Sequence, residues 1–155
     1  MRRTEQQITE HEAVEAILRR AQVCRIGLAE DNTPYVVPVC FGYKDDCLFV
    51  HSSLQGKKID MIRKNNRVCF EVDTDVQLVP ADDPCKFTVT YHSVIGFGKA
   101  VLLDNRKEKV RALNAIMEHY SDRGDYIFPD AVVDATAIIR IRIESMTGKR
   151  SKYLT

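Results

Sequence analysis

The sequence predicts a single mainly β domain with helices, a barrel-like α+β fold that spans residues 1–155. Several short segments between residues 23 and 143 alternate apolar and polar residues with the period of two that is typical of strands. Polar turn sequences such as EDNT and KDD separate the first of these segments, as expected for antiparallel hairpins. The length of 155 residues suits one domain with a substantial core.

The composition limits the classes of partner. Lys and Arg total 23 and Asp and Glu total 22, so the formal net charge is +1. This balance offers no attraction of the whole protein to nucleic acid or to an anionic membrane, and any anion site must be local. No apolar run is long enough to cross a bilayer, and the N-terminus lacks a signal-peptide pattern. We therefore expect a soluble, cytoplasmic protein.

The cysteine pattern predicts neither a disulfide framework nor a metal site. There are 5 cysteines, an odd number, and no CxxC pair. Four of them, at positions 24, 40, 47 and 69, lie within apolar runs and are expected to be small buried hydrophobes.

The first predicted element is an amphipathic helix. The sequence TEHE at Thr9–Glu12 is typical of a capping box, in which the first and fourth side chains bond the backbone at a helix start. Apolar residues then recur at helical spacing from Ala13 to Ala21, so we expect the helix to end near Gln22.

Three strands are expected to follow in VCRIGLA, PYVVPVCFGY and CLFVHS, joined by short hairpins. Pro38 lies inside the second of these segments. Because proline cannot donate a hydrogen bond to a strand ladder, Pro38 is expected at a sheet edge or a bulge. Such a break leaves neighbouring backbone groups free to meet a ligand.

The middle of the chain predicts a short helix over 55–65 and a strand over 67–73. Residues 74–86 contain two prolines and predict an irregular excursion. Residues 86–103 predict a long strand in which Gly96 and Gly98 indicate a bulge or bend.

The last elements are a helix over 105–120 and a strand over 135–143. Arg140 and Arg142 share one face of that strand, and isoleucines occupy the other. The apolar residues expected on one face of the helix are Val110, Leu113, Ile116 and Met117.

The segment LFVHSSLQGKKIDMIRKN at 48–65 is the best candidate for a phosphate site. A helix N-terminus offers free backbone N–H groups and the positive end of its dipole. The alternative is an ordinary N-capped surface helix with solvated lysines, and the residues leave both interpretations open. His51 is likewise either structural or functional. The residues that would bring hydroxyls, bare backbone and charge to an anion are Ser52, Ser53, Gly56, Lys57 and Lys58.

Two further segments are weaker candidates. In PYVVPVCFGY, a Pro-interrupted strand could offer backbone polar groups to a flat aromatic ligand, although aromatic and Val-rich strands commonly belong to a core. In YHSVIGFGKA, His92 and Ser93 point to opposite faces of a strand, so they do not form a catalytic pair. A polar contact to a ligand or to a second subunit is one interpretation, and a surface polar pair is the other.

These three segments, in this order, resemble the flavin split-barrel proteins related to pyridoxamine 5'-phosphate oxidase, and among them the nitroimidazole-resistance (Nim-type) branch. The similarity runs from the N-terminal MRR through VCRIGLAEDNTPYVVPVCFGY, LFVHSSLQGKKIDMIRKNNRVCFEVD and YHSVIGFGKA to ESMTGKRS. It implies a six-stranded antiparallel split β-barrel and a homodimer with FMN at the dimer interface.

The resemblance also implies which residues contact FMN, with His51 as the active-site histidine. The strand that would line the isoalloxazine ring with backbone groups comprises Val37, Pro38, Val39 and Cys40. The residues that would hold the ribityl phosphate are His51, Ser52, Ser53, Lys57 and Lys58. The residues that would contact the flavin from the sheet or from the partner chain are His92, Ser93, Val94 and Ile95. Family members commonly have arginine at the position of His92.

The implied function is an FMN-dependent reductase. NAD(P)H or another donor would reduce the flavin, which would then reduce a small electron-poor aromatic compound such as a nitroaromatic. His51 could supply a proton near neutral pH. The alternative is a protein that binds FMN or another flat cofactor for storage or sensing without turnover. The Trp- and Arg-bearing end of the true pyridoxamine phosphate oxidases is missing, so vitamin B6 oxidation is not expected.

Overall fold

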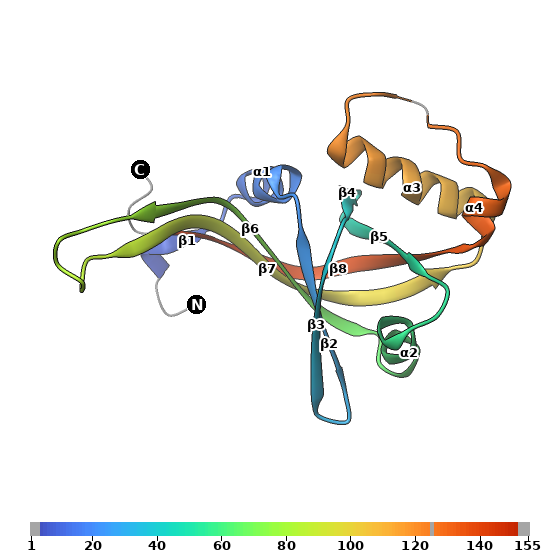
Figure 1. Ribbon diagram of the computed structural model, residues 1–155, viewed down its shortest axis with the longest axis horizontal. Helices are drawn as coiled ribbons and strands as arrows, with labels where there is room; N and C mark the ends of the chain where they lie inside the picture. Colours follow the sequence, from blue (N-terminus) through green and yellow to red (C-terminus); the bar gives the residue numbers. More distant parts are fainter. Residues whose placement is uncertain (1–3, 125, 152–155) are drawn as a thin grey trace.

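The computed structural model describes residues 4–124 and 126–151, which form one antiparallel sheet of eight strands with helices packed around it (Figure 1). The strand order is β3-β2-β6-β7-β8-β5-β4, and β1 pairs with the end of β8. The strands are β1 (Gln7–Ile8), β2 (Cys24–Glu30), β3 (Thr33–Val39), β4 (Gly42–Lys44), β5 (Cys47–Ser53), β6 (Arg67–Val79), β7 (Thr88–Leu103) and β8 (Thr136–Arg150). The helices are α1 (His11–Arg20), α2 (Lys57–Lys64), α3 (Arg106–Tyr120) and α4 (Asp130–Asp134), after a 3-10 turn at Thr4–Gln6.

The predicted class, mainly β with helices, is confirmed. Among the described residues, six strands have seven or more residues, and the short β1 and β4 are additional. β3 and β4 follow each other in the chain but lie at opposite ends of the strand order. The sheet is therefore a barrel that stays open between them, which is the split of a split barrel.

The core lies on the inner face of this sheet. The alternating residues of the central strands supply it, with Ile26, Phe70 and Ile141 each fully buried. Burial of one such side chain contributes roughly 1.5–3 kcal/mol, so this face dominates the stability of the fold. α1 and α2 contribute their apolar faces to the same core.

The predicted capping box at Thr9–Glu12 is wrong. The N-cap of α1 is Glu10, which makes no side-chain capping bond, and the Thr9 hydroxyl instead donates to the Glu10 carboxylate at 3.2 Å. The reason is tertiary, because β1 pairs Ile8 with Gly148 and keeps the chain extended up to the helix start.

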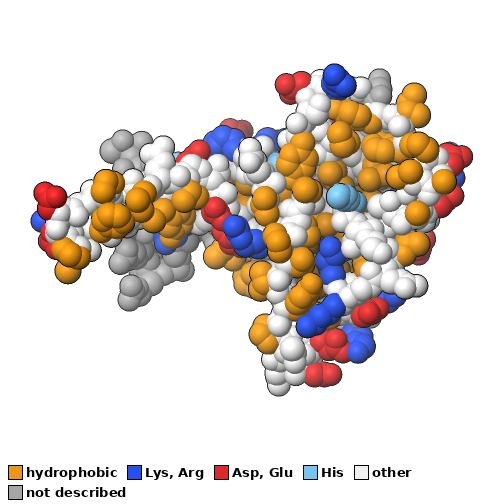
Figure 2. Space-filling view, in the orientation of Figure 1, with side chains coloured by type: hydrophobic (Ala, Val, Ile, Leu, Met, Phe, Trp, Pro, Cys, Tyr) orange, Lys and Arg blue, Asp and Glu red, His pale blue; other side chains and the backbone are white. Residues whose placement is uncertain are grey.

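The expected irregular excursion at 74–86 is confirmed for residues 80–86 and wrong for residues 74–79. β6 continues to Val79 and pairs with the start of β7 beyond a register shift between Thr74 and Gln77. The two strands form an arm that projects from the barrel (Figure 1), and hydrophobic side chains are exposed along it (Figure 2). These exposed side chains are Val76, Leu78, Phe87 and Val89.

The long segment PYVVPVCFGY contains two strands instead of one. β3 ends at Val39, and β4 starts at Gly42 on the other side of the split. Pro38 lies on an edge strand, as predicted, because β3 pairs only with β2 among the described strands. The expected irregularity near Gly96 and Gly98 is confirmed, because the β7–β8 register shifts between Phe97 and Gly98.

α3 lies against the outer side of β4 and β5. Its end is bonded to the segment just after α1, where His119 Nε2 lies 2.7 Å from the Ala21 carbonyl oxygen. Its buried residues are Ala112, Ala115 and Ile116, so the predicted apolar face is only partly right. Two of these three buried residues are alanines, because α3 approaches β4 closely at Gly42 and leaves little room for larger side chains. None of the described helices combines the length and the apolar character needed to span a bilayer.

Gly42→Ala is expected to destabilise the protein by roughly 1–3 kcal/mol, the usual cost of overpacking. The added methyl carbon would lie 2.6 Å from the Ala115 carbonyl carbon and 2.7 Å from the Ile116 nitrogen, both backbone atoms. Urea unfolding at one protein concentration measures the change. Gly124→Ala is the matched control, because no atom lies within 4 Å of its added methyl group. Equal stability of the two variants would contradict the close seating of α3 on β4.

Candidate functional site

The corner between β5 and α2 holds the predicted phosphate-binding residues. His51 pairs with Ile138 of β8, and Ser53 pairs with Thr136. His51 and Ser53 are exposed on the outer face, whereas Ser52 is half-buried on the inner face, as strand alternation requires.

α2 starts at this corner without a side-chain cap. Its N-cap is Gly56, at φ +127°, where an L side chain would be strained, and no atom lies within 4 Å of an added Cβ. The serine cap of the alternative interpretation is therefore wrong, whereas a surface helix with solvated lysines stays open as an interpretation. The first turn of α2 instead presents bare backbone to open space.

The two lysines at the start of α2 differ from the basic residues at its end. Arg63 lies 3.7 Å from Asp60, and Lys64 is paired with Glu30. Within residues 4–124 and 126–151, neither Lys57 nor Lys58 has an acidic partner at ion-pair distance. Lys58 is half-buried, and this burial lowers its pKa. A partly desolvated cation without a counter-ion is suited to receive an anion.

The surroundings of His51 at this corner lower its pKa. Partial burial lowers its pKa, and the positive charge of Lys58 lowers it further. The imidazole is therefore neutral at pH 7, with one nitrogen that can donate and one that can accept a hydrogen bond. An anion bound beside Lys58 would offset this repulsion and raise the pKa of His51.

The predicted ring-binding strand, β3, lies beside this corner. The Lys57 ammonium is 4.7 Å from the centroid of the Tyr35 ring, a cation–π contact that joins α2 to β3. Val37 and Val39 turn towards the core, whereas Pro38 and Cys40 are exposed. Cys40 was expected to be buried, and it is exposed because β3 ends just before it.

His92 of the third predicted segment lies far from His51 within one chain. His51 is opposite Ile138 of β8, whereas His92 is opposite Arg150 of the same strand. These two β8 residues are twelve positions apart, roughly 40 Å along a strand. Figure 1 shows β8 running along the long axis of the molecule. A single ligand therefore cannot touch His51 and His92 of one chain.

His92 has a structural partner where it stands. Its Nδ1 atom lies 2.9 Å from the Asp75 carboxylate, which also pairs with Arg20 of α1 at 3.1 Å. Ser93 and Val94 are buried, and Ile95 is exposed on the outer face.

Besides Ile95, the outer face of β7 carries the apolar residues Phe97 and Val101, which the sequence reasoning did not single out. Ile95, Phe97 and Val101 are 44–51 % exposed and share one side of the strand. The period-two pattern of FTVTYHSVIGFGKAV indicates that these residues share one face of the strand, but it does not tell which face is covered.

A split barrel with a basic, partly desolvated corner beside an open edge strand defines the class of protein related to pyridoxamine 5'-phosphate oxidase. The sequence profile of the family described as pyridoxamine 5'-phosphate oxidase matches residues 10–150. The chain belongs to this family, as its sequence resemblance predicted.

Solved structures with similar folds support this assignment. A candidate 5-nitroimidazole antibiotic resistance protein from Bacteroides thetaiotaomicron is 32 % identical, with a TM-score of 0.83 over 93 % of this chain and 86 % of that chain. An FAD-binding protein from Mesorhizobium loti is 26 % identical, with a TM-score of 0.68 over 93 % and 96 % of the two chains. The flavocytochrome of Azotobacter vinelandii, at 21 % identity and a TM-score of 0.84 over 98 % and 72 %, shares the fold. A comparison with curated proteins finds no match.

His51 is expected to titrate below its ordinary pKa of 6.5 in the ligand-free protein. Because the folded protein disfavours the charged imidazole, half of the His51 side chains should be protonated only at a pH below that value. Lys58→Met should raise the pKa of His51 by removing a nearby like charge. Lys57→Met is the control and should change it less, because Lys57 is held over Tyr35. NMR titration of the imidazole protons measures all three proteins, and a His51 pKa above 6.5 in the unmodified chain would contradict the described corner.

Proposed function

We propose that this protein is an FMN-dependent reductase of small electron-poor aromatic compounds. The observation that carries the proposal is the β5–α2 corner, where Lys58 is half-buried without an acidic partner among the described residues and lies close enough to His51 to lower its pKa. Family membership and the 32 % identity to a candidate nitroimidazole-resistance protein support the same reading.

The residues of the corner fit the ribityl phosphate. The backbone N–H groups of the first turn of α2, the Ser53 hydroxyl and the ammonium groups of Lys57 and Lys58 are all donors. The open space at Gly56 allows an anion to approach the backbone without meeting a side chain. The M. loti relative is named for FAD, and FAD is therefore the competing cofactor.

The open edge of β3 fits a flat ring. Among the described strands β3 pairs only with β2, so its other edge offers backbone groups, and the exposed Pro38 and Cys40 lie at the end of that edge. The contact between Tyr35 and Lys57 places this edge next to the phosphate corner.

We also propose that the site is completed by a second copy of this chain. His92, Ser93 and Ile95 are expected to contact the flavin, but they lie at the far end of β8 from His51. A two-fold dimer would bring this segment of one chain to the corner of its partner. The exposed apolar residues of β7 and of the arm support such an interface, because side-by-side apolar residues of this kind seldom face water.

A bound flavin supplies the redox chemistry, as an acceptor of hydride and a donor of electrons to the aromatic compound. The chain holds the phosphate at α2 and the ring along β3. His51 is neutral near pH 7 and within reach of the same corner, so it can donate a hydrogen bond through one nitrogen and receive a proton through the other. A phosphate bound beside Lys58 would offset the positive charge that lowers the pKa of His51. The imidazole could then carry a proton to the reduced acceptor near neutral pH.

The test of reduction is anaerobic mixing of the FMN-loaded protein with NADH or NADPH. We expect the visible flavin band to bleach and to return when a nitroaromatic compound is added. His51→Gln should slow the return of the band by about tenfold or more, with FMN still bound. A flavin that stays oxidised with both donors would instead favour a protein that binds the cofactor for storage or sensing.

Lys57→Ala combined with Lys58→Ala should weaken FMN binding by roughly 100-fold, because two charge-assisted contacts are lost. Titration of apoprotein with FMN, followed by the shift of the flavin spectrum, measures the affinity. Arg63→Ala combined with Lys64→Ala removes the same charge from the other end of α2 and should have little effect. Equal weakening in both double variants would move the phosphate away from this corner.

The same titration can be followed by sedimentation to examine the second chain. If the site is shared, FMN should shift the protein towards a dimer and bind with one FMN per chain. Equally tight FMN binding by the monomer would show that one chain forms the whole site.

A further inference from the structure

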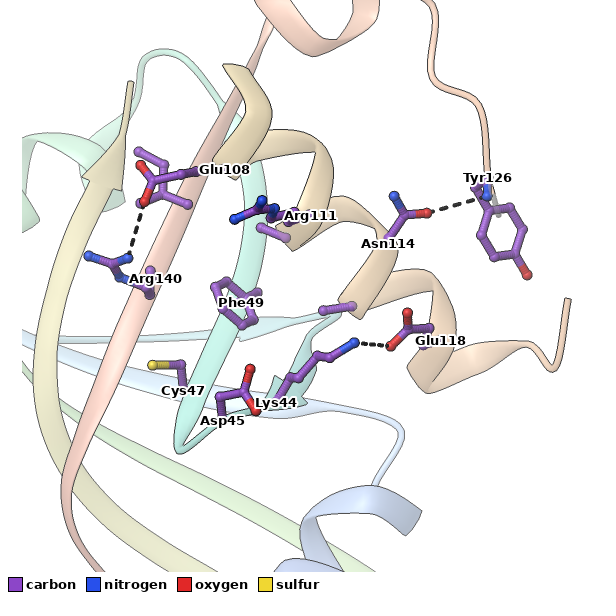
Figure 3. A pocket seen from close by; sticks show the side chains of 13 residues that line it. Lys44, Asp45, Cys47, Phe49, Glu108, Arg111, Asn114, Glu118, Tyr126 and Arg140 are labelled. Carbon is purple, nitrogen blue, oxygen red and sulfur yellow. Dashed lines mark hydrogen bonds and ion pairs between the residues drawn. The ribbon is translucent and has the colours of Figure 1, made fainter. Parts of the chain in front are cut away.

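The structure contains a cavity that is separate from the β5–α2 corner. It has a volume of about 510 Å³ and lies between the outer face of β5 and β8 and the overlying α3 (Figure 3). This volume falls within the usual range of small-molecule sites. Neither the lysines of α2 nor the edge of β3 lines it.

The cavity exists because α3 turns small side chains towards the sheet. Gly42 and the backbone of Ala115 hold the later part of α3 close to β4, and Leu103 and Ile138 pack with Ala112 nearer its start. Ala112 and Ala115 also line the cavity, where longer side chains would narrow it. Phe49 of β5 lies on the opposite wall (Figure 3).

The charged side chains around the cavity are mostly neutralised in pairs. Lys44 lies 3.0 Å from Glu118, and Arg140 lies 3.6 Å from Glu108. Arg111 lines the same space, and within the described parts of the chain no carboxylate lies at ion-pair distance from it. Its guanidinium remains charged at any physiological pH.

The cavity has a positively charged end and a negatively charged end. In Figure 3 the Phe49 ring lies between Arg111 on one side and Asp45 on the other. An anionic group would be attracted to the Arg111 end and repelled from the Asp45 end, while Phe49 and the two alanines offer an apolar surface between them.

We propose that this cavity binds an aromatic carboxylate, with the carboxylate on Arg111 and the ring against Phe49. A guanidinium pairs with a carboxylate through two parallel hydrogen bonds, which gives both affinity and orientation. The site needs no flavin, so its existence is independent of the proposed reductase activity.

The test is calorimetric titration of flavin-free protein with 2-naphthoate and, separately, with the uncharged 2-naphthamide. We expect naphthoate to bind at least about tenfold more tightly than naphthamide. Arg111→Gln should remove this difference. The matched control is Lys107→Gln, which removes one positive charge from an exposed position of the same helix outside the cavity.

A gain-of-affinity variant guards against a loss caused by misfolding. Glu108→Gln removes the partner of Arg140, which lines the same cavity, and leaves two uncompensated guanidinium groups there. Naphthoate should then bind several-fold more tightly. The proposal is overturned if naphthoate and naphthamide bind alike, if Arg111→Gln and Lys107→Gln weaken naphthoate equally, or if Glu108→Gln leaves its affinity unchanged.

Discussion

The long antiparallel pairing of β8 positions every other part of this protein. β8 has fifteen residues, and it pairs with β7 over most of its length, with β5 near its start and with β1 near its end. A slip of one residue would move Ile139 and Ile141 out of the main core and turn Arg140 into it, so the register is strongly specified. The same pairing places His51 near the start of β8 and His92 near its end, so the two histidines lie far apart within one chain.

The chemistry of the β5–α2 corner results from partial burial of charge. Lys58 lies half-buried beside His51, and each would be more easily charged in water. The ligand-free corner therefore carries an electrostatic cost that a bound anion would relieve. Tyr35 holds Lys57 by a cation–π contact and links this corner to the open edge strand. The proposed phosphate and ring subsites would thus be parts of one surface.

α3 belongs to the other side of the molecule and is fixed by close backbone approach at Gly42 rather than by large apolar side chains. Polar contacts complete its attachment, because the Tyr120 hydroxyl donates to the Gln22 carbonyl at 2.8 Å and accepts from the Phe41 backbone at 3.1 Å. Because α3 is held at Gly42 and Tyr120 and presents small side chains to the sheet, free volume remains between the helix and the sheet. The cavity beside Arg111 is a consequence of this mode of packing.

Local pattern determined the fold class, most helices and strands, the edge position of Pro38 and the irregularity near Gly98, because periodicity, proline and glycine act through the backbone of the residues themselves. Tertiary pairing decided the rest. β1 displaced the expected cap at Thr9, and the pairing of β6 with β7 ordered residues 74–79 that local signals marked as irregular. The family resemblance implied that His51 and His92 contact one flavin, with His92 on the sheet or on the partner chain. Only the β8 register placed the two histidines far apart within one chain, because strand partners distant in the chain set positions that no local pattern encodes.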